Sequence, residues 1–110
     1  MKKTFKLGSK QKTITRTLAI SRESIQFIKQ VTVLQENVIM DPFAEGYKES
    51  DVTELELNMM ALYVKRASEL LEQPEDYFEN IDYFDIVNFV QDVQEFLSQQ
   101  GESGKKSGED

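Results

Sequence analysis

The residue types that most often carry out chemistry at neutral pH are missing from this 110-residue chain. It contains no histidine and no cysteine, so it lacks the usual general base, the commonest metal ligand and a thiolate nucleophile. Carboxylate pairs occur at Glu75-Asp76 and at Asp82 and Asp85, and carboxylates can bind a hard cation or exchange protons. Neither pair has a second cluster at a defined spacing, and acids at a helix start already have a structural use. We therefore expect no enzyme, and no catalytic, cofactor-binding or metal-binding residue.

Binding motifs for phosphate and calcium are absent from the sequence as well. The chain has no glycine-rich phosphate loop, no Walker sequence and no calcium loop with acids at alternate positions around a glycine. With 20 acidic and 13 basic residues it carries a net charge of -7. This combination is typical of a small acidic protein that binds other proteins.

Two amphipathic helices between Val52 and Leu97 must carry any binding surface. In the first, Thr53 and Glu56 have the spacing of a capping box, which predicts the helix start. Its apolar residues recur at steps of three and four, and Pro74 ends it. Its main stripe is Leu57, Met60, Val64, Ala67 and Leu71, broadened by Leu55, Met59, Tyr63 and Leu70.

The second helix is predicted to begin at Asp82, which is a suitable N-cap, with Asp85 in its first turn. Two helices with wide apolar faces and a short linker are expected to pack antiparallel. The linker, residues 74–80, can form a single helical turn whose aromatic pair closes the end of the bundle. The apolar stripe of the second helix consists of Ile86, Val90, Val93 and Leu97, with Phe89 and Phe96 beside it.

Alternating apolar and polar residues predict an N-terminal β-hairpin over about residues 3–20. Phe5 and Leu7 alternate with polar residues, residues 8–10 supply a turn, and apolar residues at even positions continue to Ile20. Ser21 is expected to cap a helix that runs to Asn37, and residues 40–51 form a loop.

These elements predict one domain over residues 1–97, mainly α with a small N-terminal β-hairpin (α+β) and a three-helix core. Residues 98–110 contain three of the five glycines and no apolar residue. Such a segment cannot bury anything, so we expect a disordered acidic, glycine-rich C-terminal tail.

Charge is distributed unevenly along the chain. Residues 1–20 hold six basic side chains and no acid, so the remaining ninety residues carry seven bases and twenty acids. So acidic a body repels nucleic acid, and we expect no nucleic-acid partner. The sequence also lacks the apolar run of a signal peptide or a membrane span, which predicts a soluble intracellular protein without membrane contact.

The order of these elements resembles the tail assembly chaperones of long-tailed (siphovirus-type) bacteriophages and prophages. In that family the long helix leads into an acidic turn containing phenylalanine and then a glycine or asparagine, a hydrophobic residue and aspartate. Here these are Phe78 and Asn80-Ile81-Asp82. The other segments that carry the resemblance are Lys2-Lys3-Thr4-Phe5-Lys6-Leu7, Ala61-Leu62-Tyr63-Val64 and Pro74-Glu75-Asp76-Tyr77.

The resemblance implies binding without catalysis. Such chaperones coat the tape measure protein, keep it soluble and recruit tail tube subunits during tail morphogenesis. They act in the cytoplasm of the bacterial host and are not expected in the mature virion. A longer form often arises by ribosomal frameshifting, for which codons at Gly104-Lys105-Lys106 are suited. The candidate partner-binding residues are Met59, Met60, Tyr77 and Phe78, although each also suits a core.

Two other functions stay open at the level of sequence. An acidic phage or mobile-element inhibitor that mimics nucleic acid would fit the net charge, although the acids are spread around helix surfaces. A structural subunit of a tail would self-assemble. A homo-oligomer is compatible with all three readings.

Overall fold

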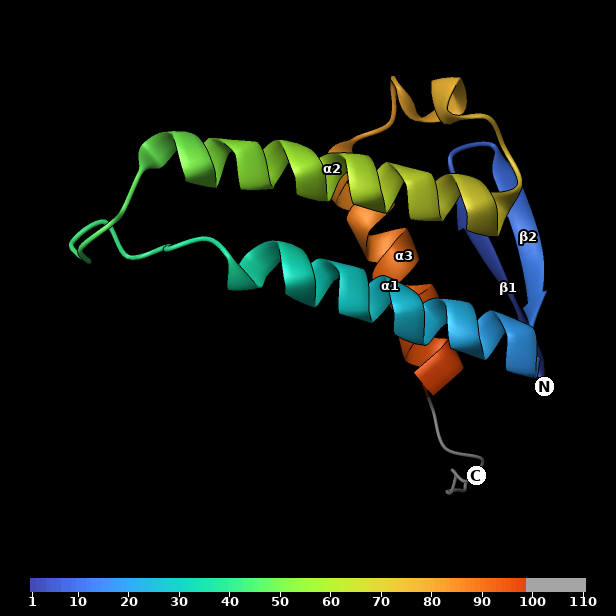
Figure 1. The fold of residues 1–110 in the computed structure, drawn as a ribbon. Helices are drawn as coiled ribbons and strands as arrows, with labels where there is room; N and C mark the ends of the chain where they lie inside the picture. Colours follow the sequence, from blue (N-terminus) through green and yellow to red (C-terminus); the bar gives the residue numbers. More distant parts are fainter. Residues whose placement is uncertain (99–110) are drawn as a thin grey trace.

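The computed structural model describes residues 1–98 and confirms a mainly helical protein with an N-terminal hairpin (Figure 1). Its elements are the strands β1 (Lys2–Leu7) and β2 (Lys10–Thr15), the helices α1 (Leu18–Glu36) and α2 (Glu49–Leu71), the 3-10 turn η1 (Glu75–Phe78) and the helix α3 (Tyr83–Ser98). Ser98, predicted as the first tail residue, is the last residue of α3. The rest of the predicted tail, including Gly104-Lys105-Lys106, lies outside the described residues.

The hairpin is antiparallel, with Lys2 opposite Thr15 and Leu7 opposite Lys10. Because side chains alternate between the two faces of a strand, one face carries the buried residues and the other carries lysines and threonines. The buried residues of the hairpin are Phe5, Leu7 and Ile14. This face lies on the helices, as predicted.

The hairpin ends at Thr15 rather than near Ile20, so the predicted second strand was too long. Thr17, not Ser21, caps α1, and its Oγ1 accepts a hydrogen bond from the backbone N–H of Ile20 at 3.2 Å. The apolar alternation from position 14 to position 20 misses position 16, which is Arg16. Residues 18–20 instead form the first helical turn, in which Leu18 is exposed and Ile20 packs on the core.

The helix α2 begins at Glu49, so the predicted capping box at Thr53 is wrong. Lys48 precedes the helix in an extended conformation and makes no side-chain cap. Glu49 and Asp51 in the first turn favour this earlier start, because the N-terminal end of a helix attracts negative charge. The other end was predicted well: α2 stops at Leu71, three residues before Pro74.

The third helix and the turn before it match the sequence prediction. Residues 75–78 form the single turn η1. Asp82 precedes α3, and its Oδ1 accepts a hydrogen bond from the backbone N–H of Phe84 at 2.8 Å. All six residues of the predicted apolar stripe of α3 are buried.

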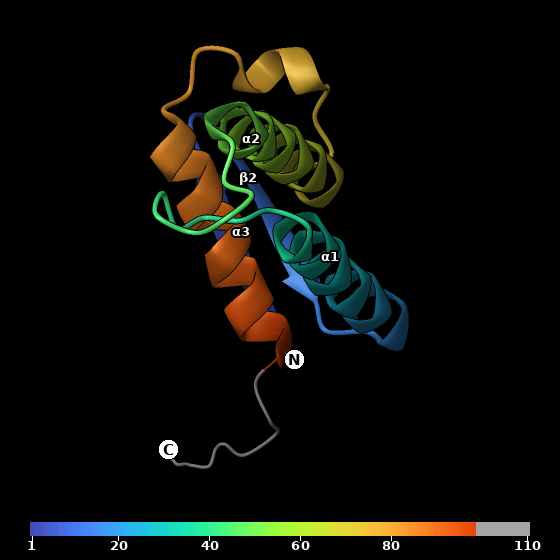
Figure 2. The same ribbon diagram turned by 60° about the vertical axis from the view of Figure 1, so that its left-hand side comes forward.

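The helices α2 and α3 do not form the simple antiparallel pair that we expected from residues 52–97. The helices α1 and α2 run antiparallel side by side, and α3 crosses both of them (Figures 1 and 2). This crossing follows from the wide apolar face of α3, which contacts α1, α2 and β1 at once.

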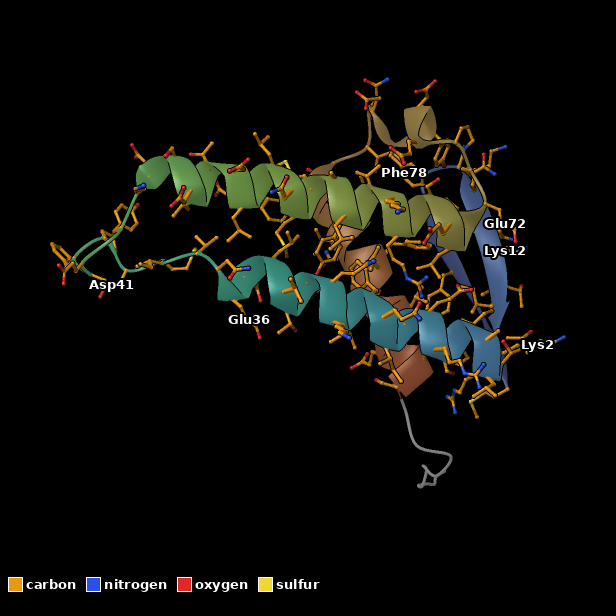
Figure 3. All side chains as sticks on the ribbon, viewed as in Figure 1. Lys2, Lys12, Glu36, Asp41, Glu72 and Phe78 are labelled. Carbon is orange, nitrogen blue, oxygen red and sulfur yellow. The ribbon has the colours of Figure 1, made fainter. Side chains whose placement is uncertain are left out.

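The core is built from residues near the two ends of the described chain, in the ranges 5–27 and 67–97. Its buried residues are Phe5, Leu7, Ile14, Phe27, Ala67, Leu70, Leu71, Phe78, Ile86, Phe89, Val90, Val93, Phe96 and Leu97. Between Phe27 and Ala67 no buried residue belongs to this cluster, although the half-buried residues Val31, Leu62, Tyr63 and Val64 pack against it. We call residues 28–65 the distal arm: it comprises the C-terminal half of α1, most of α2 and the loop that joins them. In Figure 3, Glu36 and Asp41 mark its far end and Lys12 and Glu72 mark the opposite end of the molecule.

Candidate partner-binding surface

Two of the four predicted contact residues, Tyr77 and Phe78, hold the fold together. Only 3% of Phe78 is exposed. The Tyr77 hydroxyl donates a hydrogen bond to the Leu7 carbonyl at 2.7 Å and accepts from the backbone N–H groups of Ser9 and Lys10 at 3.0 and 3.2 Å. The Tyr77 hydroxyl therefore links the turn η1 to the hairpin turn, although Tyr77 and Leu7 are 70 residues apart in the sequence.

The Tyr77 hydroxyl also explains the glycine in the hairpin turn. Gly8 has φ +64°, and a Cβ placed on it would lie 2.6 Å from the tyrosine oxygen. Any larger residue at this position would both strain the backbone and displace the hydroxyl.

Tyr77→Phe should lower the free energy of unfolding by about 1–3 kcal/mol, because the hydroxyl bonds are lost and the Leu7 carbonyl is left without its partner. Urea denaturation measures this loss. Tyr47→Phe is the control, since within residues 1–98 no hydrogen bond of the Tyr47 hydroxyl is found. Equal stability losses in both variants would contradict the anchoring role of Tyr77.

The other two predicted contact residues, Met59 and Met60, lie on the distal arm. Met59 is half-buried and Met60 is 42% exposed. Leu57 is exposed on the same helix, so the predicted core stripe of α2 faces solvent over its first half. The reason is that the first half of α2 extends beyond the core cluster, against which α2 packs from Leu62 onward. Leu55 is the exception in that half, because it is buried.

A groove runs between α1 and α2 along the distal arm, with a volume of about 560 Å³. We call it the α1–α2 groove. Its lining residues are Lys29, Gln30, Val33, Leu34, Asn58, Ala61, Leu62 and Lys65. A smaller hollow of about 310 Å³ continues it toward the tip of the arm past Asn37, Val38, Asp51, Glu54 and Leu55. Neither Met59 nor Met60 lines the groove or this hollow.

The α1–α2 groove has an apolar floor and charged ends of opposite sign. Val33, Leu34, Ala61 and Leu62 make up the floor, and Val33 and Ala61 are exposed. Lys29 and Lys65 flank the end of the groove near the core. Acidic side chains flank the end at the tip of the arm, namely those of Asp51 and Glu54.

A buried arginine fixes the two helices at the base of the groove. Arg66 on α2 is buried, and its Nη1 lies 3.6 Å from Glu23 of α1 and 3.8 Å from Glu69. Burial lowers the pKa of Arg66 below its usual value, while the two glutamates act in the opposite direction. The guanidinium also lies 5.9 Å from the centre of the Phe27 ring. This cluster joins α1 to α2 where the arm meets the core.

Among residues 1–98 no group of three or more acidic side chains is arranged to hold a metal ion. No helix in the same range is long and apolar enough to cross a membrane. The α1–α2 groove is the candidate site. Apolar side chains line its middle, and charged side chains flank it at both ends.

No model of a known protein family, no characterised protein and no solved structure significantly matches the chain.

Proposed function

We propose that this protein is an assembly chaperone without enzymatic activity, which holds an amphipathic helix of a longer protein in the α1–α2 groove. The observation that carries the proposal is the apolar floor of the groove, in which Val33 and Ala61 are exposed and no residue belongs to the buried core cluster. A groove between two helices accepts the apolar face of a third helix, and this is a common mode of peptide recognition.

The partner that we propose is the tape measure protein of a long-tailed phage or prophage, because of the family resemblance stated above. A long helical protein with apolar stripes aggregates unless these stripes are covered, and several copies of a small groove protein can cover them in series. The net charge of -7 supports the same role, since a strongly charged exterior keeps a complex in solution. In this role the protein would also recruit tail tube subunits in the host cytoplasm, and it would need no cofactor.

Co-expression with the tape measure protein of the same phage or prophage tests the proposal, with size-exclusion chromatography and light scattering as the readout. We expect a soluble complex in which several copies of this chain accompany one long chain. If the long protein stays insoluble and this chain elutes alone, the chaperone function is wrong.

Ala61→Asp should weaken binding to the long protein by about tenfold or more, because it places an unpaired carboxylate on the apolar floor. Ala61 is exposed, so the free protein should keep its fold. Co-purification of the variant with the long protein measures the loss of binding.

Met60→Asp is the matched control for Ala61→Asp. It adds the same charge at the neighbouring exposed residue of α2, which does not line the groove. We expect Met60→Asp to bind normally. Loss of binding in Met60→Asp alone would instead place the contact on the face that carries the methionine pair.

A further inference from the structure

We infer that, in the free protein, a second copy of this chain covers the α1–α2 groove, related to the first by a two-fold axis that runs across the groove. The two α1–α2 pairs would then stack face to face as a four-helix bundle. This inference concerns the protein alone and does not depend on the proposed function.

The distal arm has the dimensions and the unpartnered apolar surface that such a bundle requires. The arm contains residues 28–36 of α1 and 49–65 of α2, which are about 14 and 26 Å of helix. On the groove side, Val33 and Ala61 are exposed, and Leu34 and Leu62 are only half-buried. Stacking two copies buries these residues against their counterparts, as apolar faces are buried in four-helix bundles.

The charges at the two ends of the groove select one orientation for the second copy. An axis across the groove reverses its direction, so the end with Lys29 and Lys65 in one copy faces the end with Asp51 and Glu54 in the other. Because α2 of one copy then lies over α2 of the other, Lys65 meets the acidic pair directly. The symmetry repeats the same attraction at the opposite end of the groove. Asn58, which lies between Lys65 and the acidic pair along α2, would then lie near the axis.

The other face-to-face arrangement is disfavoured by the same charges. A two-fold axis along the groove would place the lysines of one copy over the lysines of the other, and acids over acids. Like charges brought together at an interface oppose association. The groove is therefore complementary to itself in only one of the two orientations.

Such a dimer would also regulate the groove. The second copy and a helix of the partner protein would contact the same apolar floor, so the partner would have to displace the second copy. Apolar surface on the arm would then stay covered until a partner is present.

Light scattering on the full chain, over a range of micromolar concentrations, tests for the dimer. Two charge-reversal variants test its orientation: variant A carries Lys29→Glu and Lys65→Glu, and variant B carries Asp51→Lys and Glu54→Lys. All four side chains are exposed, and circular dichroism checks that each variant is folded. We expect each variant alone to dimerise about 100-fold more weakly, because like charges now oppose each other at both ends.

Mixing variants A and B should restore association as a heterodimer, since opposite charges again meet at both ends. A chain with all four substitutions should dimerise with itself. These two results separate a specific orientation from a general effect of net charge. They also distinguish the inference from the proposed function, because neither experiment contains the long partner.

A cysteine placed near the axis gives a second test that does not rely on charge. The chain has no natural cysteine, so Asn58→Cys should form a disulfide-linked dimer under oxidising conditions. Glu56→Cys, which is exposed on α2 but does not line the groove, should not do so. A monomer at every concentration, a series of larger oligomers, or cross-linking only through Glu56→Cys would overturn the inference.

Discussion

Val90→Asp is expected to unfold the protein at neutral pH. Val90 is 0% exposed and lies in α3, in the core cluster formed by the hairpin and the helices. A carboxylate in this position lies within the apolar core cluster, and changes of this kind cost more than about 4 kcal/mol. A domain of this size has a total stability of roughly 5–15 kcal/mol. Far-UV circular dichroism should therefore show a large loss of helix or a much lower melting temperature.

Two comparisons make the Val90→Asp result specific. Gln91→Asp adds the same side chain at the next residue, which is exposed, and should change stability by no more than about 0.5 kcal/mol. Burial favours the neutral form of an acid, so Val90→Asp should regain structure as the pH falls. If Val90→Asp melts like the unmodified protein, then α3 does not lie at the centre of the core.

Phe78→Ala should lower the free energy of unfolding by about 3–5 kcal/mol, which is the usual cost of removing a buried aromatic ring. Phe78 is part of the core cluster, and its ring meets that of Tyr77 edge to face at a centroid distance of 5.2 Å. Urea denaturation should show a lower midpoint.

The control for Phe78→Ala is Phe43→Ala in the loop of the distal arm. Phe43 is 96% exposed, so its removal should leave stability nearly unchanged. The pair also tests the sequence prediction that Phe78 contacts a partner. If Phe78→Ala keeps its stability but no longer binds the long protein, Phe78 is a contact residue rather than a core residue.

Much of the fold could be predicted because several local signals agreed with the final packing. Asp82 marked the start of α3, and all six residues of its predicted apolar stripe are buried. Alternation at Phe5 and Leu7 identified the hairpin face that lies on the helices. These signals depend on residues a few positions apart, and tertiary contacts reinforce them.

The errors arose where a local pattern does not show how far the core extends. Leu57 and Met60 continue the periodicity of Ala67 and Leu71, yet the core ends between these pairs. The apolar periodicity is the same on both sides of that boundary, so the sequence does not show where the core ends. The capping box at Thr53 failed for a related reason, because the acids that precede it allow the helix to start earlier.

The α1–α2 groove could not be found from either helix alone. Its floor combines Val33 and Leu34 with Ala61 and Leu62, which come from two helices separated by the loop of the distal arm. The second and third helices were predicted to pack against each other, whereas the groove depends on the packing of the first helix against the second. No residue of α1 was predicted as a contact residue.

The contribution of both chain ends to the core has a consequence for synthesis on the ribosome. The ring of Phe5 packs against the rings of Phe89 and Phe96, at centroid distances of 6.5 and 5.7 Å. The hairpin therefore lacks its main packing partner until α3 has been translated and has left the exit tunnel. Domains whose contacts join distant parts of the chain fold late and more slowly than those with local contacts. We expect that nascent chains stopped before α3 remain sensitive to protease, and that resistance appears only after the last helix emerges.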